Sequence, residues 1–173
     1  TRANLYLWRR FRRDLHHELR LDEGEPSEWW RRPTDVDFLV GSEAVAAGLV
    51  TRHELRTRFV PVYRNVYVAK GRTLTAADRA RAAWLWSRRQ AIVAGTSAAA
   101  WHGSLWIDDR LPAELIQPSQ HKTKGIVLHS EQLDDDEVVC LRGLRVTSPA
   151  RTAYDLGRRA GLTLAVVRLD ALM

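Results

Sequence analysis

The sequence has very little cysteine and no long apolar run, and both absences narrow the class of protein. Cys140 is the only cysteine among 173 residues, which excludes an internal disulfide framework and a multi-cysteine zinc site. No stretch approaches the roughly 20 apolar residues that a membrane-spanning helix needs. The arginine-rich N-terminus also lacks the apolar segment of a secretory signal. We therefore expect a soluble cytoplasmic protein with no membrane partner.

Lysine is scarce as well. Lys70, Lys122 and Lys124 are the only lysines, and arginine supplies the other 24 of the 27 basic residues. A nuclease centre would need a pair of acids and a lysine around a metal ion, and the sequence contains no Glu-x-Lys element. Three groups could suggest a metal site: the pairs His16-His17 and Asp108-Asp109, and the acidic run at 134–137. None of them has the ligand spacing of a zinc or calcium site. We therefore expect no catalytic residue, no metal and no other cofactor.

The remaining composition is typical of a folded, basic protein. Hydrophobic residues make up 45% of the chain, the net charge is +6 and the isoelectric point is about 10.1. Arginine can bind phosphate or guanine through two donors at once. A GC-rich coding sequence also favours arginine, and many proteins carry such a surplus without a polyanionic partner. The position of the charge along the chain therefore says more about a nucleic-acid partner than the net charge does.

Residues 1–34 are predicted to form an amphipathic helix and a tryptophan-containing connector. Leu5, Trp8 and Leu15 belong to an apolar set with three- and four-residue spacing over 3–21. The polar stretch 22–27 ends this helix.

Residues 35–72 combine two short helices with a hairpin. Ser42 is expected to cap a helix over 43–47, and Thr51 opens a second helix that ends near Arg58. Glu54 stands three residues after Thr51, which is the spacing of a capping box.

Two alternating runs follow, at 59–63 and 66–69. The intervening Arg64-Asn65 pair predicts a tight turn, because asparagine tolerates positive φ. Two capped helices followed by a hairpin are the components of a winged helix-turn-helix, in which the second helix enters the major groove. Pro61 weakens the first strand but is tolerated at a sheet edge.

Most of the surplus charge falls in this region. Residues 52–72 contain six basic residues and one acid, a local net charge of +5. We expect the second helix to face the major groove through Arg52, His53 and Arg56. We expect phosphate contacts from Arg58, Arg64, Lys70 and Arg72. The alternative is a solvated basic face on an element that binds no nucleic acid.

Residues 73–173 predict a mixed α/β domain in which helices flank a small sheet, so the whole chain is assigned to the α+β class. The expected strands are 91–94, 114–116, 125–129 and one or two within 138–146. The expected helices are 75–89, a short one from Thr96 or Ser97 to Gly103, one from Ser148-Pro149 to Gly161, and 162–173. Ser97 and His102 lack the setting of a nucleophile and base, and we interpret them as a cap and a hydrogen-bonded histidine.

Several motifs together resemble the AbiEi-type antitoxin family over roughly residues 36–173. They are VGSEAVAAG (40–48), TRHELR (51–56), NVYV (65–68), AWLW (83–86), AGTSAAAWHG (94–103), PAELI (112–116) and VTSPARTAYDL (146–156). The resemblance implies a winged helix that binds the promoter of a toxin–antitoxin operon, and an α/β domain needed for antitoxicity. It also implies a nucleotidyltransferase toxin as a functional partner. In a similar branch, the same region precedes a domain like very-short-patch-repair endonucleases, and the present chain ends about where that domain would begin.

Three functions remain open from the sequence. The first is a transcriptional regulator of the type IV antitoxin kind, which binds double-stranded DNA specifically and represses its own operon. The second is the DNA-targeting module of a larger endonuclease-like protein. The third is a protein-interaction domain whose basic hairpin binds an acidic partner.

Overall fold

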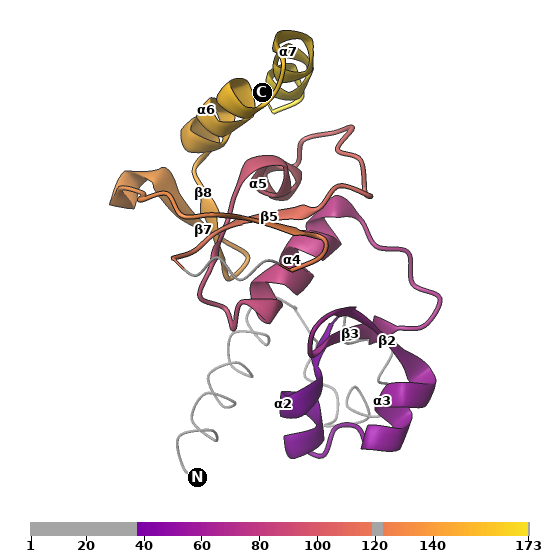
Figure 1. The fold of residues 1–173 in the computed structure, drawn as a ribbon. Coiled ribbons are helices and arrows are strands. Elements are labelled where there is room, and N and C mark those ends of the chain that lie inside the picture. Colours follow the sequence, from indigo (N-terminus) through magenta and orange to yellow (C-terminus); the bar gives the residue numbers. More distant parts are fainter. Residues whose placement is uncertain (1–37, 119–122, 173) are drawn as a thin grey trace, which may run out of the picture. The chain divides into compact units, whose positions relative to one another are not determined.

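The structure is a computed structural model that describes residues 38–118 and 123–172. These residues form six α-helices and two small sheets, so the predicted α+β class is confirmed (Figure 1). They lie within one compact unit, Pro33–Met173. The predicted amphipathic helix and connector at 1–34 lie outside the described residues. Among the described helices, none is both long and apolar enough to cross a lipid bilayer.

The first part of the described chain is a helix–helix–hairpin element, residues 39–69. Its members are β1 (Leu39–Val40), α2 (Gly41–Ala46), α3 (Arg52–Arg58), β2 (Phe59–Tyr63) and β3 (Val66–Ala69). β3 lies between β1 and β2, and both pairings are antiparallel. The predicted second helix and hairpin are therefore confirmed. Asn65 adopts φ = 64° in the turn, as expected for a residue that tolerates the left-handed region.

The two short helices begin in different ways. The Thr51 hydroxyl accepts from Glu54 N at 3.1 Å and the Glu54 carboxylate accepts from Thr51 N at 2.8 Å, which confirms the predicted capping box of α3. The predicted Ser42 cap of α2 is wrong, because this helix already begins at Gly41 and has no side-chain cap within its own sequence. Its first two amides donate to Asn65, Gly41 N to the carbonyl at 2.8 Å and Ser42 N to Oδ1 at 2.9 Å. The hairpin turn thus supplies the acceptors from 23 positions away.

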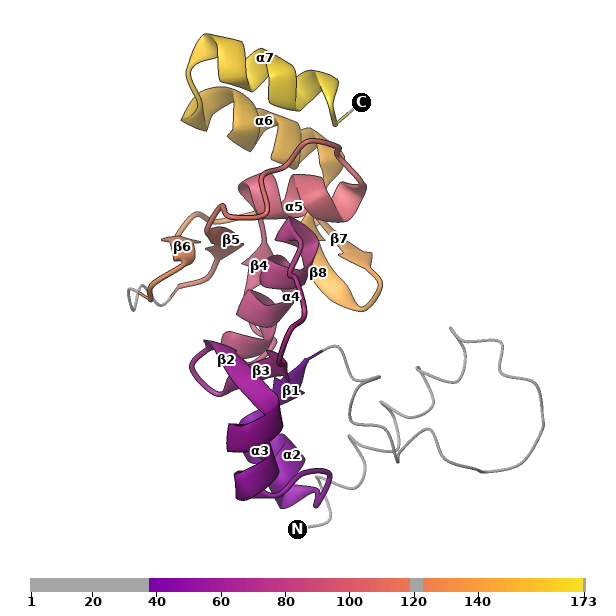
Figure 2. The ribbon, with the colours of Figure 1, turned by 90° about the vertical axis from the view of Figure 1, so that its right-hand side faces the viewer.

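The rest of the chain forms a five-stranded mixed sheet with four helices. The strand order is β6-β5-β4-β8-β7, with β5–β6 and β4–β8 parallel and the other pairs antiparallel. The elements are α4 (Ala76–Trp86), β4 (Ile92–Val93), α5 (Gly95–His102), β5 (Ala113–Ile116), β6 (Ile126–His129), β7 (Val138–Leu141), β8 (Leu144–Thr147), α6 (Pro149–Arg159) and α7 (Leu162–Asp170). Helices α4 and α5 pack against β5 and each other, α6 packs on α5, and α7 on α6 (Figure 2).

Three predicted helix boundaries need correction, in α4, α5 and α7. The helix expected to reach Arg89 ends at Trp86, because the Ser87 hydroxyl donates to the Trp84 carbonyl and accepts from Ala91 N. Arg88 and Arg89 then adopt positive φ, which no α-helix allows.

The short helix was expected to start at Thr96 or Ser97, and the last helix to reach residue 173. The short helix instead starts at Gly95 after Ala94, because Thr96 and Ser97 both bond to Glu114 of the neighbouring strand. The last helix ends at Asp170. The Ser148 cap with Pro149 and the Gly103 terminus are confirmed.

One hydrophobic core joins the helix–helix–hairpin element to the five-stranded sheet. Tyr63 and Val66 of the hairpin share a buried cluster with Ala83 of α4 and with Val93 and Leu115 of the sheet. Burial of apolar surface therefore stabilises both parts together. A smaller cluster of Leu39, Ala44, Val50 and Phe59 lies within the element itself.

Candidate nucleic-acid interface

Helix α3 has one apolar and one basic side. Leu55 is half-buried and packs on the small core of the element. Since successive residues are about 100° apart on a helix, His53 and Arg56 fall away from Leu55, and Arg52 lies beside Arg56 one turn earlier. All three side chains are exposed, and within residues 38–118 and 123–172 neither arginine takes part in an ion pair. The structure thus brings Arg52, His53 and Arg56 together on the solvent side of α3.

The next predicted residue, Arg58, lies on a different side of the same helix. Its guanidinium is 4.0 Å from Glu54, and both side chains are largely exposed. Bonds from the Thr51 amide and hydroxyl lower the pKa of Glu54, so this carboxylate stays ionised at neutral pH. The pair offsets part of the charge of Arg58 without burying it, and exposed pairs of this kind are weak.

Two predicted residues border the hairpin. Arg64 is exposed in the turn, and Lys70 is exposed directly after β3. Lys70 N donates to the Arg58 carbonyl at 3.0 Å, which places the lysine beside the end of α3. At the other end of this helix, Arg52 and Asn65 line the same shallow groove between α2 and α3. Basic side chains therefore follow the edge of the element from one end of α3 to the other.

Arg72 differs from the other predicted residues, because it is engaged within the protein. Its Nη2 donates to Asp78 Oδ1 at 3.2 Å, and its guanidinium lies over the Phe38 ring, 5.5 Å from the centroid. These contacts hold the side chain against the first turn of α4. A phosphate contact from Arg72 would have to compete with the Asp78 carboxylate.

A bidentate ion pair connects α2 to the turn after α4, and nothing in the sequence pattern indicated it. Arg89 donates to both carboxylate oxygens of Glu43, at 2.8 and 2.7 Å, across 46 positions. The hydrogen bonds from Arg89 lower the pKa of Glu43. The positive φ of Arg89 turns the chain so that the guanidinium reaches α2. The pair therefore depends on the tertiary structure and not on local spacing.

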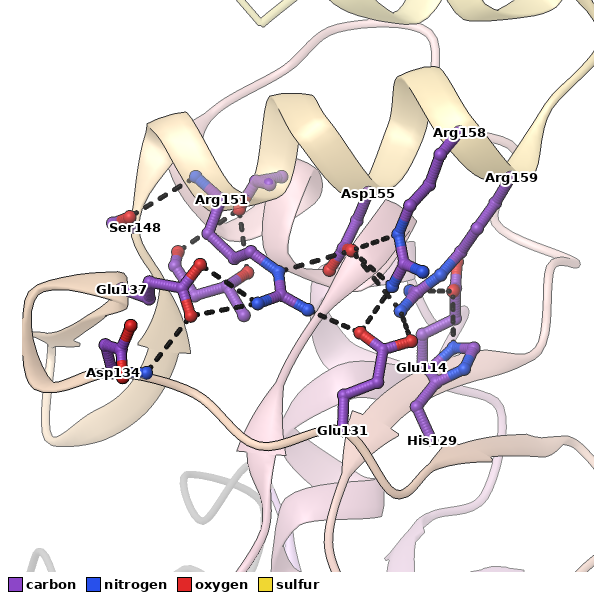
Figure 3. A network of polar contacts seen from close by, with 12 residues as sticks. Glu114, His129, Glu131, Asp134, Glu137, Ser148, Arg151, Asp155, Arg158 and Arg159 are labelled. Atoms are coloured by element: carbon purple, nitrogen blue, oxygen red, sulfur yellow. Dashed lines mark hydrogen bonds and ion pairs between the residues drawn. The ribbon is translucent and has the colours of Figure 1, made fainter.

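A second polar feature was also missed, an arginine–carboxylate network where α6 meets the sheet (Figure 3). Its members are Glu114, His129, Glu131, Glu137, Arg151, Asp155, Arg158 and Arg159. Asp155 is fully buried, and its Oδ1 lies 3.3 Å from Arg151 Nε, 2.9 Å from Arg158 Nη2 and 3.4 Å from Arg159 Nη2. All three arginines also bond to Glu131, which follows β6.

Glu114 connects this network to the start of α5. Its carboxylate accepts from Thr96 N at 2.9 Å and Thr96 Oγ1 at 2.7 Å, and His129 Nε2 lies 3.1 Å away. Gly95 allows this approach, because a Cβ there would lie 2.3 Å from Glu114 Oε2. Each carboxylate of the network bonds to a cation, which fits a structural role for the network. Among the described residues, no group of three or more His, Cys, Asp or Glu side chains could hold a metal ion.

The network predicts a loss of stability in acid. Burial opposes ionisation of Glu114, but bonds from His129 and Thr96 outweigh it and lower its pKa from 4.5 to about 2. Because the folded-state pKa lies below the unfolded one, the stabilisation is complete above pH 5 and falls progressively as the pH approaches 2. Urea unfolding at several pH values should show this decline. In Glu114→Gln the decline should be shallower, and an unchanged pH dependence would contradict the assignment.

Comparison with known proteins assigns no family to the chain. No model of a protein family matches the chain, and no curated protein is significantly similar to it. The resemblance to AbiEi-type antitoxins therefore remains a prediction.

Proposed function

We propose that the helix–helix–hairpin element is a winged helix-turn-helix that binds double-stranded DNA. The observation that carries the proposal is the exposed basic side of α3, with Arg52, His53 and Arg56 beside a hairpin that has Arg64 in its turn. The order β1-α2-α3-β2-β3 has the two helices and the hairpin that such a domain requires. In the proposed complex α3 lies in the major groove and the hairpin follows the phosphate backbone.

The dimensions of α3 suit this arrangement. An α-helix with its side chains is about 10–12 Å across, and the major groove is about 12 Å wide. An arginine on the groove side can donate to O6 and N7 of a guanine, and discrimination against other bases follows from that geometry. Arg58, Arg64 and Lys70 would then contact phosphates, with a smaller contribution from Arg72 because of its bond to Asp78.

The biological role that we propose is that of a cytoplasmic transcriptional regulator that represses its own operon. This part of the proposal comes from the antitoxin resemblance, which also implies a nucleotidyltransferase toxin as functional partner. A targeting module of an endonuclease-like protein would use the same interface, but without preference for its own promoter. A protein-interaction domain would instead present the basic hairpin to an acidic partner.

A salt titration of DNA binding tests the proposal. Binding of the full chain to labelled duplexes should be measured with the sequence upstream of its own gene and with random sequence. Contacts to about five phosphates would give a log–log slope near −4.5, because each contact releases counterions. Tighter binding to the upstream duplex would support the regulator, and equal binding would support the targeting module. Absence of binding at low salt would contradict both and favour the protein-interaction domain.

A further inference from the structure

A second basic feature lies at a cleft of about 470 Å³ beside the hairpin. Its walls come from four separate segments: residues 61–64 of the hairpin, Arg79 of α4, residues 110–112, and residues 123–125. Four lining residues are cationic, and none is acidic: Arg64, Arg79, Arg110 and Lys124. Of these four residues, only Arg64 was predicted from the sequence to contact phosphate.

The hairpin side of the cleft is held in place by a hydrogen bond. Tyr63 is buried, and its hydroxyl donates to the Gly125 carbonyl at 3.2 Å. This bond joins the residue before Arg64 to the residue after Lys124. Arg64 and Lys124 are therefore kept at the same cleft although they are distant in sequence.

The two carboxylates that precede Arg110 in the sequence are already engaged in hydrogen bonds. Arg79 Nε donates to the Asp109 carbonyl at 2.6 Å, which orients the guanidinium from α4. The Asp109 carboxylate accepts from Ala76 N at 2.7 Å, and Asp108 accepts from Arg110 N at 2.8 Å. Both acids that precede Arg110 thus bind backbone amides. The positive charge of the cleft is not offset by any residue that lines it.

We propose that this cleft binds phosphate groups, with Arg64, Arg79, Arg110 and Lys124 as donors. Four cations at one hollow repel one another, and a polyanion relieves that repulsion while accepting their hydrogen bonds. The other walls, Pro61, Val62, Leu111 and Pro112, are apolar and suit a sugar or base beside the phosphate. The phosphate can belong to bound DNA that extends past the hairpin or to a free nucleotide. If the phosphate belongs to DNA, the inference rests on the proposed function. If it belongs to a free nucleotide, the inference is independent of that function.

The test uses Arg110→Ala/Lys124→Ala in the full chain, with Arg145→Ala as the matched control. Both cleft side chains are exposed, and Arg145 is an exposed arginine of β8 outside the cleft. One arm measures binding of ATP and of pyrophosphate by calorimetry without DNA. The other arm measures the salt dependence of binding to duplex DNA. Circular dichroism of the three proteins verifies that they are folded.

If the cleft contacts DNA, the double variant should lose about 1.8 from the magnitude of the salt slope, because two phosphate contacts disappear. If it binds a free nucleotide, ATP should bind the wild type and the control at least tenfold more tightly than the double variant. If the double variant matches the control in both arms, the proposal is wrong. A third result separates the two proposals: the wild type binds ATP but no DNA, and the double variant loses ATP binding. This result would refute the proposed function and leave the assignment of the cleft intact.

Discussion

Replacing Arg52 and Arg56 together by alanine is expected to weaken binding to the preferred duplex about 100-fold at fixed salt. Each guanidinium on the groove side of α3 can form a bidentate contact to a base, and such a contact contributes about 1–3 kcal/mol of discrimination. Both side chains are exposed, so the substitution removes DNA contacts without opening the core. Fluorescence anisotropy with labelled duplex would give the dissociation constant. The preference over random sequence should fall as well.

The control for this result is Arg145→Ala, which removes one exposed arginine from β8. The dissociation constant of the control should change by less than twofold. A double variant that binds like the control would show that α3 does not enter the groove. Loss of overall affinity with an undiminished preference for the upstream sequence would place these arginines on phosphates instead of bases.

Asp155→Ala is expected to lower the free energy of unfolding by about 3–5 kcal/mol, which is a large part of the stability of a typical domain. Asp155 is fully buried between three arginines, and Arg151 has a side-chain exposure of 9%. Removing the carboxylate takes away the fully buried counter-charge between three arginines, which then keep only the Glu131, Glu137 and Glu114 carboxylates as partners. Losing one member of a buried ionic network is costly, because the like charges that remain are poorly solvated. Urea denaturation followed by circular dichroism would measure the change.

Asp170→Ala provides the comparison for this prediction, because Asp170 is exposed at the end of α7. Its free energy of unfolding should stay within about 0.5 kcal/mol of the wild type. Equal stability of the two variants would mean that the network contributes little. DNA affinity of the folded fraction of Asp155→Ala should remain unchanged, since the network and α3 share no described contact partner.

The parts of the interface that could be predicted are those with a local signal. The capping box of α3 needs only Thr51 and Glu54 at the correct spacing, and the hairpin needs an alternating pattern around a residue that accepts positive φ. Both features are therefore encoded by residues that lie close together in the sequence. The spacing of Arg52 and Arg56, four residues apart, also predicted that they share one side of α3.

The sequence by itself thus determined the α+β class, the second helix and hairpin, and the concentration of positive charge around them. Only the tertiary structure decided which distant groups meet. Asn65 of the hairpin turn accepts hydrogen bonds from the first amides of α2. Arg89 pairs with Glu43, and three arginines of α6 share Glu131. Caps and alternating strands depend on neighbours a few residues away, so their spacing appears in the sequence. Ion pairs and clefts have no period along the chain, because packing of the shared core sets the distances between their members.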